Sequence, residues 1–138
     1  MASYVKFQSF VEKLAEKAHD LGSDTLTVAL TTNANAPVNT DDVLADLTEI
    51  SYTNCSSRAI TTATSAETAG TYKLVMTDLT LTASGGTVGP FQWVIVYNDT
   101  AANDELICYF DYGSEITLAD GETFLLDFDA SNGLLQIA

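Results

Sequence analysis

The two most apolar segments of the chain are Phe91–Tyr97, FQWVIVY, and Leu106–Tyr112, LICYFDY. In each segment apolar residues occupy both odd and even positions, a pattern typical of strands that are buried on both faces of a sheet. The residues between them, Asn98–Asp104, are turn-rich and predict a hairpin connection of somewhat unusual length. The two segments therefore predict the central strands of a mainly β fold.

Turn signals recur at short intervals after these strands. Gly113–Ser114 precedes a short strand at Glu115–Leu118, Asp120–Gly121 precedes a strand at Thr123–Phe128, and Asn132–Gly133 precedes a last apolar run at Leu134–Ile137. Asp-Gly and Asn-Gly are the dipeptides that two-residue hairpin turns favour. The C-terminal half is therefore expected to form an antiparallel meander.

The middle of the chain is more varied. Leu26, Val28 and Leu30 alternate with small and polar residues, which predicts a strand with one solvent-exposed face within Asp24–Thr31. The segments that follow are interpreted as an exposed loop at Thr32–Asp42, one or two helical turns at Val43–Ile50, an edge strand at Arg58–Thr62 before a long loop, and a strand at Tyr72–Ala83 with a β-bulge near Thr77 and Asp78.

A helical period is found only near the N-terminus. Between Tyr4 and Leu21, apolar residues recur at three- and four-residue steps, with Lys and Glu between them. Ser3 is a plausible N-cap, and Gly22 stands where a left-handed C-terminal cap would lie. The pattern predicts an amphipathic helix over residues 4–21, packed on one face or across one end of the sheets.

Together these elements predict one domain over residues 1–138. The expected architecture is a helix at 4–21 followed, over 24–138, by an antiparallel β-sandwich or small barrel of about seven or eight strands. A chain of 138 residues with 46% hydrophobic residues can form its own core without a metal or a disulfide framework.

The net charge of −14 limits the classes of partner. The five basic residues are Lys6, Lys13, Lys17, Arg58 and Lys73, so no base offsets the ten acids between Asp78 and Asp129. Nucleic-acid binding needs clustered Lys and Arg, so we expect no nucleic-acid partner. We expect no membrane partner either, because no apolar run approaches the roughly 20 residues of a spanning helix. Basic protein surfaces or divalent cations suit this charge.

Acidic side chains are the first candidate site. Asp99, Asp104 and Glu105 cluster in one loop, and the hairpins after it carry five further acids: Asp111, Asp120, Glu122, Asp127 and Asp129. Such oxygen ligands suit Ca²⁺, but the alternating ligands of an EF-hand are missing, and Asp is common in turns for backbone reasons. We interpret the acids as a solvated rim and expect no metal or other cofactor.

Catalytic candidates are few. His19 is the only imidazole, and at the end of the predicted helix its charged form would meet the helix dipole favourably. A Ser-His-Asp triad would have to use it, yet no Gly-x-Ser-x-Gly motif accompanies it. Asp111-Tyr112-Gly113 superficially matches a kinase magnesium motif without the phosphate loop that such a motif requires. We therefore expect no catalytic residue and no enzyme activity.

Aromatic residues and cysteines complete the candidates. The aromatic residues of the C-terminal half are Phe91, Trp93, Tyr97, Tyr109, Phe110, Tyr112, Phe124 and Phe128. They could stack on carbohydrate, but their two-residue spacing favours core packing. Cys55 and Cys108 are interpreted as idle thiols, with a single disulfide between them as the alternative.

The order and spacing of the segments resemble a group of small structural proteins of tailed bacteriophages. The resemblance covers most of the chain and is weakest at Tyr52–Gly70. The matching segments are FQSFVEKLAEKAHDLGSDTLTVALTT from Phe7, VLADLTEI at Val43–Ile50, and FQWVIVYNDTAANDELICYFDYGSEITLADGETFLLDF at Phe91–Phe128.

The resemblance implies a virion component that is assembled in the host cytoplasm. It points to a capsid decoration (cement) protein that binds the outer surface of the major capsid shell and stabilises it, with the major capsid protein as partner and a dimer or trimer as the oligomer. The alternative is a module of the tail or tail fibre that binds a host receptor or glycan. In that case, exposed loops such as Asn33–Asp42 and Asn98–Asp104 would carry recognition.

Overall fold

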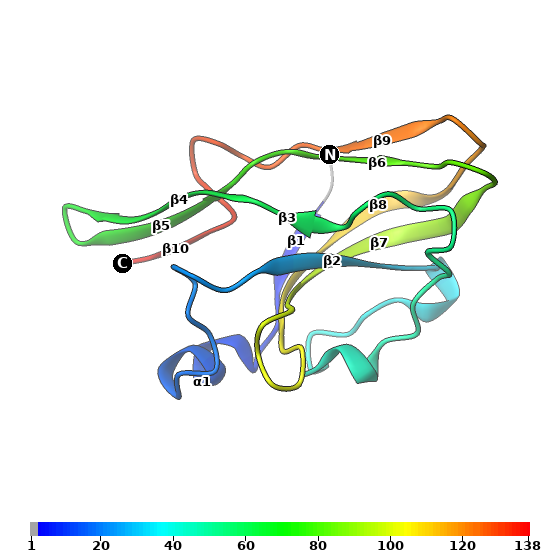
Figure 1. The fold of residues 1–138 in the computed structure, drawn as a ribbon. Helices are drawn as coiled ribbons and strands as arrows, with labels where there is room; N and C mark the ends of the chain where they lie inside the picture. Colours follow the sequence, from blue (N-terminus) through cyan, green and yellow to red (C-terminus); the bar gives the residue numbers. More distant parts are fainter. Residues whose placement is uncertain (1–2) are drawn as a thin grey trace.

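A computed structural model describes residues 3–138 and shows a sandwich-like arrangement of antiparallel sheets (Figure 1). One layer is a five-stranded sheet in the order β1-β8-β7-β2-β3, formed by Ser3–Lys6 (β1), Leu106–Leu118 (β8), Val88–Asn98 (β7), Leu26–Thr31 (β2) and Ala59–Ile60 (β3). The facing layer has a sheet in the order β10-β5-β4, formed by Leu135–Ile137, Thr71–Met76 and Thr62–Thr68, and a pair β6-β9, formed by Leu79–Thr82 and Thr123–Leu126. The predicted antiparallel, mainly β class is confirmed, with ten strands in the described chain instead of seven or eight.

The long hairpin of β7 and β8 lies at the centre of the five-stranded sheet. The apolar segments Phe91–Tyr97 and Leu106–Tyr112 both lie within it, and the connection between them is a hairpin loop, as predicted. Residues Val94–Asn98 and Leu106–Tyr109 are buried without interruption. Strands buried on both faces need apolar residues packed against both faces, so the rest of the chain must provide two apolar layers around this hairpin.

A large bulge interrupts β8. Phe91 pairs with Ile116 and Trp93 pairs with Asp111, so the segment Tyr112–Glu115 of β8 lies opposite the single residue Gln92 of β7. Gly113 takes a φ of +96°, which few other residues adopt. The sequence prediction divided β8 at Gly113–Ser114 into two strands, which is wrong, because the extra residues bulge outward while pairing with β7 resumes beyond them.

Each face of the five-stranded sheet has its own apolar core. The core between the two layers contains Leu26, Val28, Leu30, Leu74, Leu81, Phe91, Val96 and Leu118 among others. The core on the opposite face is smaller and consists of Phe7, Ala29, Ile95, Tyr97, Leu106 and Tyr109, with Val5, Leu44, Leu47 and Trp93 against it. In Figure 1 the cyan segment with the two 3₁₀ turns η1 (Asn33–Asn35) and η2 (Leu44–Asp46) lies beneath this face.

The N-terminal prediction of a helix over 4–21 is wrong in extent. Residues Ser3–Lys6 form the edge strand β1, paired with Cys108–Asp111 of β8, and the helix α1 spans only Phe10–Ala15. Lys17, not Gly22, takes the left-handed conformation that ends the helix, with a φ of 70°. Pairing with β8 and the burial of Phe7 outweigh the local helical period, because tertiary contacts override propensity.

The β2 prediction is correct in position and wrong in exposure. All six residues Leu26–Thr31 are buried, because the small core covers the face that alternation assigned to solvent. The predicted exposed loop and helical turns at 32–50 correspond to loop with the short turns η1 and η2. The predicted edge strand at Arg58–Thr62 is found as β3, but the long loop expected after it is instead β4, which pairs with β5.

The predicted bulge near Thr77 and the C-terminal meander are also wrong. The parity switch after Met76 marks the passage from β5 to β6, which belong to different sheets. Asp120–Gly121 does form a turn, yet β9 beyond it pairs with β6 and not with β8, and β10 pairs with β5. Turn dipeptides specify local chain reversal, whereas the partner of a strand depends on distant residues.

The edge of β2 beyond its short pairing with β3 is closed by side chains. The hydroxyl of Tyr52 accepts a hydrogen bond from the backbone N–H of Leu30 at 2.9 Å and donates one to Glu49 at 2.7 Å. Arg58 donates to the carbonyl of Val28 and lies over the Tyr52 ring, 3.6 Å from its centroid. This clamp satisfies backbone groups that a further strand would otherwise pair with.

We predict that Tyr52→Phe lowers the free energy of unfolding by about 1–3 kcal/mol, because the Leu30 N–H is left buried without an acceptor. Urea denaturation measures the change. Tyr112→Phe is the matched control, since Tyr112 is 50% exposed, and we expect a change within about 0.5 kcal/mol. Equal losses in the two variants would contradict the clamp.

Candidate functional site

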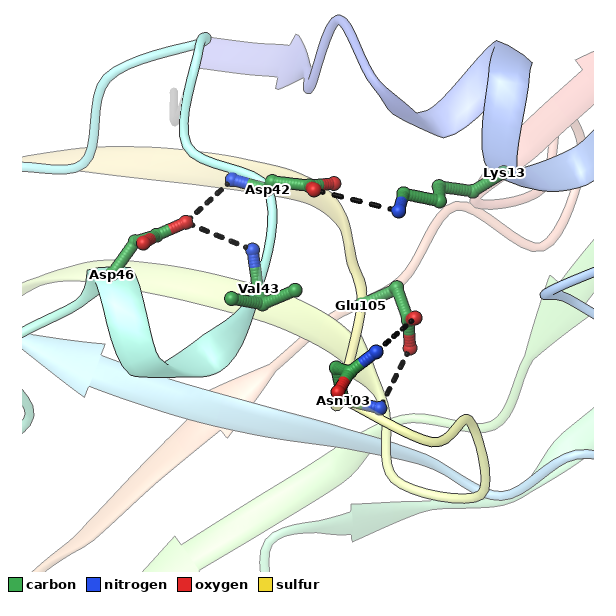
Figure 2. Close-up of polar contacts among 6 residues, drawn as sticks. All are labelled: Lys13, Asp42, Val43, Asp46, Asn103 and Glu105. Atoms are coloured by element: carbon green, nitrogen blue, oxygen red, sulfur yellow. Dashed lines mark hydrogen bonds and ion pairs between the residues drawn. The ribbon is translucent and has the colours of Figure 1, made fainter.

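Three segments meet at one end of the sheet: α1, the segment around Asp42 and the β7–β8 loop (Figure 2). Lys13 forms an ion pair with Asp42 at 3.4 Å, and Asp46 accepts hydrogen bonds from the N–H groups of Asp42 and Val43 at 2.9 and 3.1 Å. These backbone donors hold the pKa of Asp46 below its usual range. Val43 also forms a β-bridge with Glu105, so the connection between β2 and β3 is held against the β7–β8 loop.

Glu105 is an almost fully buried carboxylate in this cluster, with 4% of its surface exposed. It accepts hydrogen bonds from the backbone N–H and the side-chain amide of Asn103 at 3.2 and 3.3 Å. Figure 2 shows both contacts between Asn103 and Glu105. A buried carboxylate is stable only when hydrogen-bonded, and Asn103 supplies these bonds from within the hairpin loop itself.

His19 lies beside this cluster, buried to 5% exposure in the connection between α1 and β2. The side-chain amide of Asn98, itself fully buried, lies 3.0 Å from His19 Nδ1 and donates to Asp24 at 2.6 Å. Burial lowers the pKa of His19, opposed by the nearby carboxylates Glu105 and Asp24 and reinforced by Lys13. The prediction of a charged His19 at a helix end is therefore wrong, because the helix ends at Ala15.

The hydrogen bonds of Asn98 determine which ring nitrogen of His19 carries the proton. The Asn98 carbonyl oxygen accepts from the N–H groups of Thr100 and Ala101 at 3.0 and 3.1 Å, which directs its NH₂ group toward His19. Nδ1 must then accept, and the proton of the neutral ring resides on Nε2. A Ser-His-Asp triad requires the opposite arrangement, with Nδ1–H donated to a carboxylate and Nε2 free to accept from serine.

A shallow depression of about 350 Å³ brings His19 near Asp20 and Ser65. Ser65 Oγ is engaged with the Tyr72 hydroxyl at 2.8 Å, and Asp20 accepts hydrogen bonds from Ser23 and Gly22 in its own turn. These partners leave the three side chains in separate hydrogen-bonded groups. The geometry supports a structural role for His19, which ties the α1–β2 connection to the end of β7.

The acidic residues that suggested Ca²⁺ are distributed over several turns. Asp99 accepts from Thr27, Asp111 from Gln92 and Gly113, Asp120 from Gly85, Glu122 from Ala119, and Asp129 from Ser131 and Asn132. Within residues 3–138, no group of three or more His, Cys, Asp or Glu side chains could hold a metal ion. In this structure the carboxylates close turns and fix loops.

Cys55 and Cys108 are free thiols, so the alternative of a disulfide between them is wrong. Cys108 is fully buried beside Tyr4, and burial raises the pKa of its thiol well above the usual range. Cys55 is half-buried, and desolvation raises its thiol pKa as well. Both thiols are therefore poor nucleophiles at neutral pH.

An apolar groove lies between β8 and β9, where the two layers of the sandwich meet. It has a volume of about 390 Å³ and is lined by Val94, Phe110, Tyr112 and the segment Thr123–Phe128. Tyr112, at the bulge of β8, meets Phe124 edge to face with 5.3 Å between ring centroids. Tyr112 and Leu125 nevertheless remain 50% and 56% exposed.

A second groove adjoins the first. It lies between α1 and β10, and it includes Tyr4, Val11 and Ile137, which are 43%, 54% and 40% exposed. Tyr4 contacts Phe110 of the first groove edge to face, with 5.4 Å between ring centroids, so the two grooves are neighbours. We refer to the combined surface as the aromatic side and define it by Tyr4, Val11, Phe110, Tyr112, Phe124, Leu125 and Ile137.

The aromatic side contains five of the six exposed large apolar residues of the described chain. Sequence reasoning placed Phe110, Tyr112 and Phe124 in the core on account of their spacing, and that prediction is wrong for Tyr112. The Gly113 that follows Tyr112 was the only local signal, since glycine within a strand pattern suggests a bulge. Contiguous exposed apolar surface on a soluble domain typically marks a binding site.

Comparisons with known proteins add no relative. No protein-family model, no curated protein and no solved structure matches the chain.

Among residues 3–138, no helix has the length and apolar character needed to cross a membrane.

The His19 network predicts a pH-dependent stability. Because the folded state holds the pKa of His19 below the ordinary value of about 6.5, the unfolded chain takes up the proton first, and the free energy of unfolding falls as the pH decreases below that value. In His19→Gln this contribution is absent, so the loss between about pH 7 and pH 5 should be smaller than in the wild type. Urea denaturation across this range measures both slopes, and identical slopes would disprove a neutral buried His19.

Proposed function

We propose that this protein is a structural binding protein of a tailed-bacteriophage particle, a decoration (cement) protein that binds the outer surface of the capsid shell. The observation that supports the proposal is the aromatic side, an exposed apolar surface formed by two neighbouring grooves on a chain of net charge −14. Exposed aromatic rings bury large areas on association at little conformational cost, which makes them effective anchors in protein interfaces.

The remaining features of the fold suit a rigid clamp between neighbouring subunits. The long loops are fixed to the sheets: the N–H of Gln8 donates to Asn39 at 2.9 Å, and the N–H of Leu106 donates to Asp42 at 2.9 Å. A surface that is ordered before binding loses little entropy on association. The resemblance of the sequence segments to tailed-phage structural proteins directs the proposal to the virion, with the major capsid protein as partner and a dimer or trimer as the assembled form.

The alternative function, a tail or tail-fibre module that binds a host receptor or glycan, would use the same fold differently. Recognition would then depend on Asn33–Asp42 and Asn98–Asp104. The first loop begins beside the bulge, where the N–H of Asn33 donates to Glu115 at 2.9 Å, and the second closes the β7–β8 hairpin. Replacement of these loops should abolish host-cell or glycan binding under the alternative. It should leave particle binding unchanged under the decoration proposal.

The first prediction of the proposed function concerns stoichiometry. Quantitative mass spectrometry of purified particles should find the chain near one copy per major capsid subunit, or at a simple fraction of it. Particles that lack it should release their genome at a lower temperature. A few copies confined to tails would contradict the decoration role and favour the alternative, and complete absence from particles would rule out both.

The second prediction concerns the binding surface. Leu125→Ser should reduce the amount of protein bound to capsids that lack it, because the exposed side chain of an interface anchor is removed. Val38→Ser is the matched control, since Val38 is 54% exposed and Leu125 56%, but Val38 lies outside the aromatic side. Co-sedimentation with capsids measures both variants, and equal binding would exclude the aromatic side as the contact.

A further inference from the structure

The strand edges of this fold are closed unequally. The outer edge of β6 is covered by the segment around Cys55: Cys55 bridges Ala83, and Ser56 and Thr82 exchange hydrogen bonds at 2.9 and 3.0 Å. The edge of β2 is covered by the clamp of Tyr52 and Arg58 described above. Exposed edges can pair with other chains, and these two are blocked.

One edge that borders the first groove, the outer edge of β9, has no partner strand among residues 3–138. β9 pairs with β6 on one side and with no described strand on the other. An unpaired strand edge therefore borders an apolar groove, an arrangement that fits an added strand better than a globular knob.

The chemistry of the groove restricts the side chains of such a strand. Alternate residues of an extended segment point to the same face, so every second side chain would reach the rings of Phe110, Tyr112 and Phe124. Those residues must be apolar. Asp127 lines the same groove, whereas the base Lys6 lines the adjoining second groove, so the remaining side chains of the added strand face a carboxylate at the first groove.

Charge also decides between a second copy and a different partner. A second copy would bring the same acidic C-terminal half, with ten acids from Asp78 onward and no base, against itself. Like charges at an interface oppose association, whereas Lys and Arg on a partner would be attracted to it. The observations therefore favour a basic partner.

We propose that the groove between β8 and β9 binds an extended segment of a partner protein that adds as a strand to the open edge of β9. Alternate apolar side chains of this segment enter the groove, and the intervening residues are Lys or Arg. The proposal rests on the proposed function only for the identity of the partner as the capsid protein. The chemistry of recognition is a property of this chain.

A synthetic capped peptide of alternating lysine and valine is the probe. Its controls are a peptide of the same composition with the valines in one block, and an alternating glutamate and valine peptide. We expect the lysine–valine peptide to bind at least about tenfold more tightly than either control. In amide NMR spectra the largest shifts should fall on Thr123–Asp127, and the β9 amides should become protected from exchange with solvent.

Two variants separate groove binding from general attraction to an acidic protein. Leu125→Ser should weaken lysine–valine binding by roughly tenfold, whereas Val38→Ser, with equal exposure elsewhere, should leave it unchanged. Equal binding of the alternating and block peptides, or equal binding to the two variants, would overturn the proposal. Self-association that Leu125→Ser abolishes would overturn it in favour of a second copy.

The experiments distinguish failure of the decoration role from failure of the groove proposal. If the peptide binds as expected and the chain is absent from particles, the decoration role fails and the groove proposal stands. If the chain is present at capsid stoichiometry and the peptide does not bind, the groove proposal alone fails.

Discussion

The rest of the fold depends on the pairing of β7 with β8. This hairpin is buried on both faces over Val94–Asn98 and Leu106–Tyr109, so the chain before and after it must provide two separate apolar covers. One cover is the layer formed by β4, β5, β6, β9 and β10. The other is assembled from Phe7, Leu44 and Leu47, which lie in short or irregular segments. The loop-rich first third of the chain is therefore part of the core and not a mere connection.

The same requirement explains which sequence predictions hold. Phe91–Tyr97 and Leu106–Tyr112 are correctly identified as central strands, because burial on both faces gives a strand a continuous apolar run whatever its partners are. The prediction for residues 4–21 fails for the opposite reason. The positions of Phe7, Phe10 and Leu21 fit a helical period, yet Phe7 packs in the small core and Phe10 and Leu21 in the large one. A periodic pattern indicates which residues are buried, but it does not show that they are buried in two different cores.

The exposure of the aromatic side could not be predicted from the sequence, for a related reason. The exposure of Tyr112 arises from a bulge whose size is set by two distant pairs, Phe91 with Ile116 and Trp93 with Asp111. The exposure of Leu125 depends on β9 pairing with β6 and not with β8. Neither fact has a local signature, since turn dipeptides such as Asp120–Gly121 do not specify which strands they bring together. The net charge of −14, in contrast, can be read directly from composition.

Acidity and the open edge are best understood together. A strand edge beside exposed aromatic rings is a hazard for any protein, because identical chains can pair there and aggregate. The usual remedy is to cover the edge, and β2 and β6 are covered in this way. Covering β9 would also remove the surface available to a partner. A high density of like charge offers a different protection: it repels further copies of the same chain while leaving the edge accessible to a segment of opposite charge. The groove between β8 and β9 is lined by Asp127, and the base Lys6 lines only the adjoining groove, so like charge at the open edge opposes the approach of a second copy.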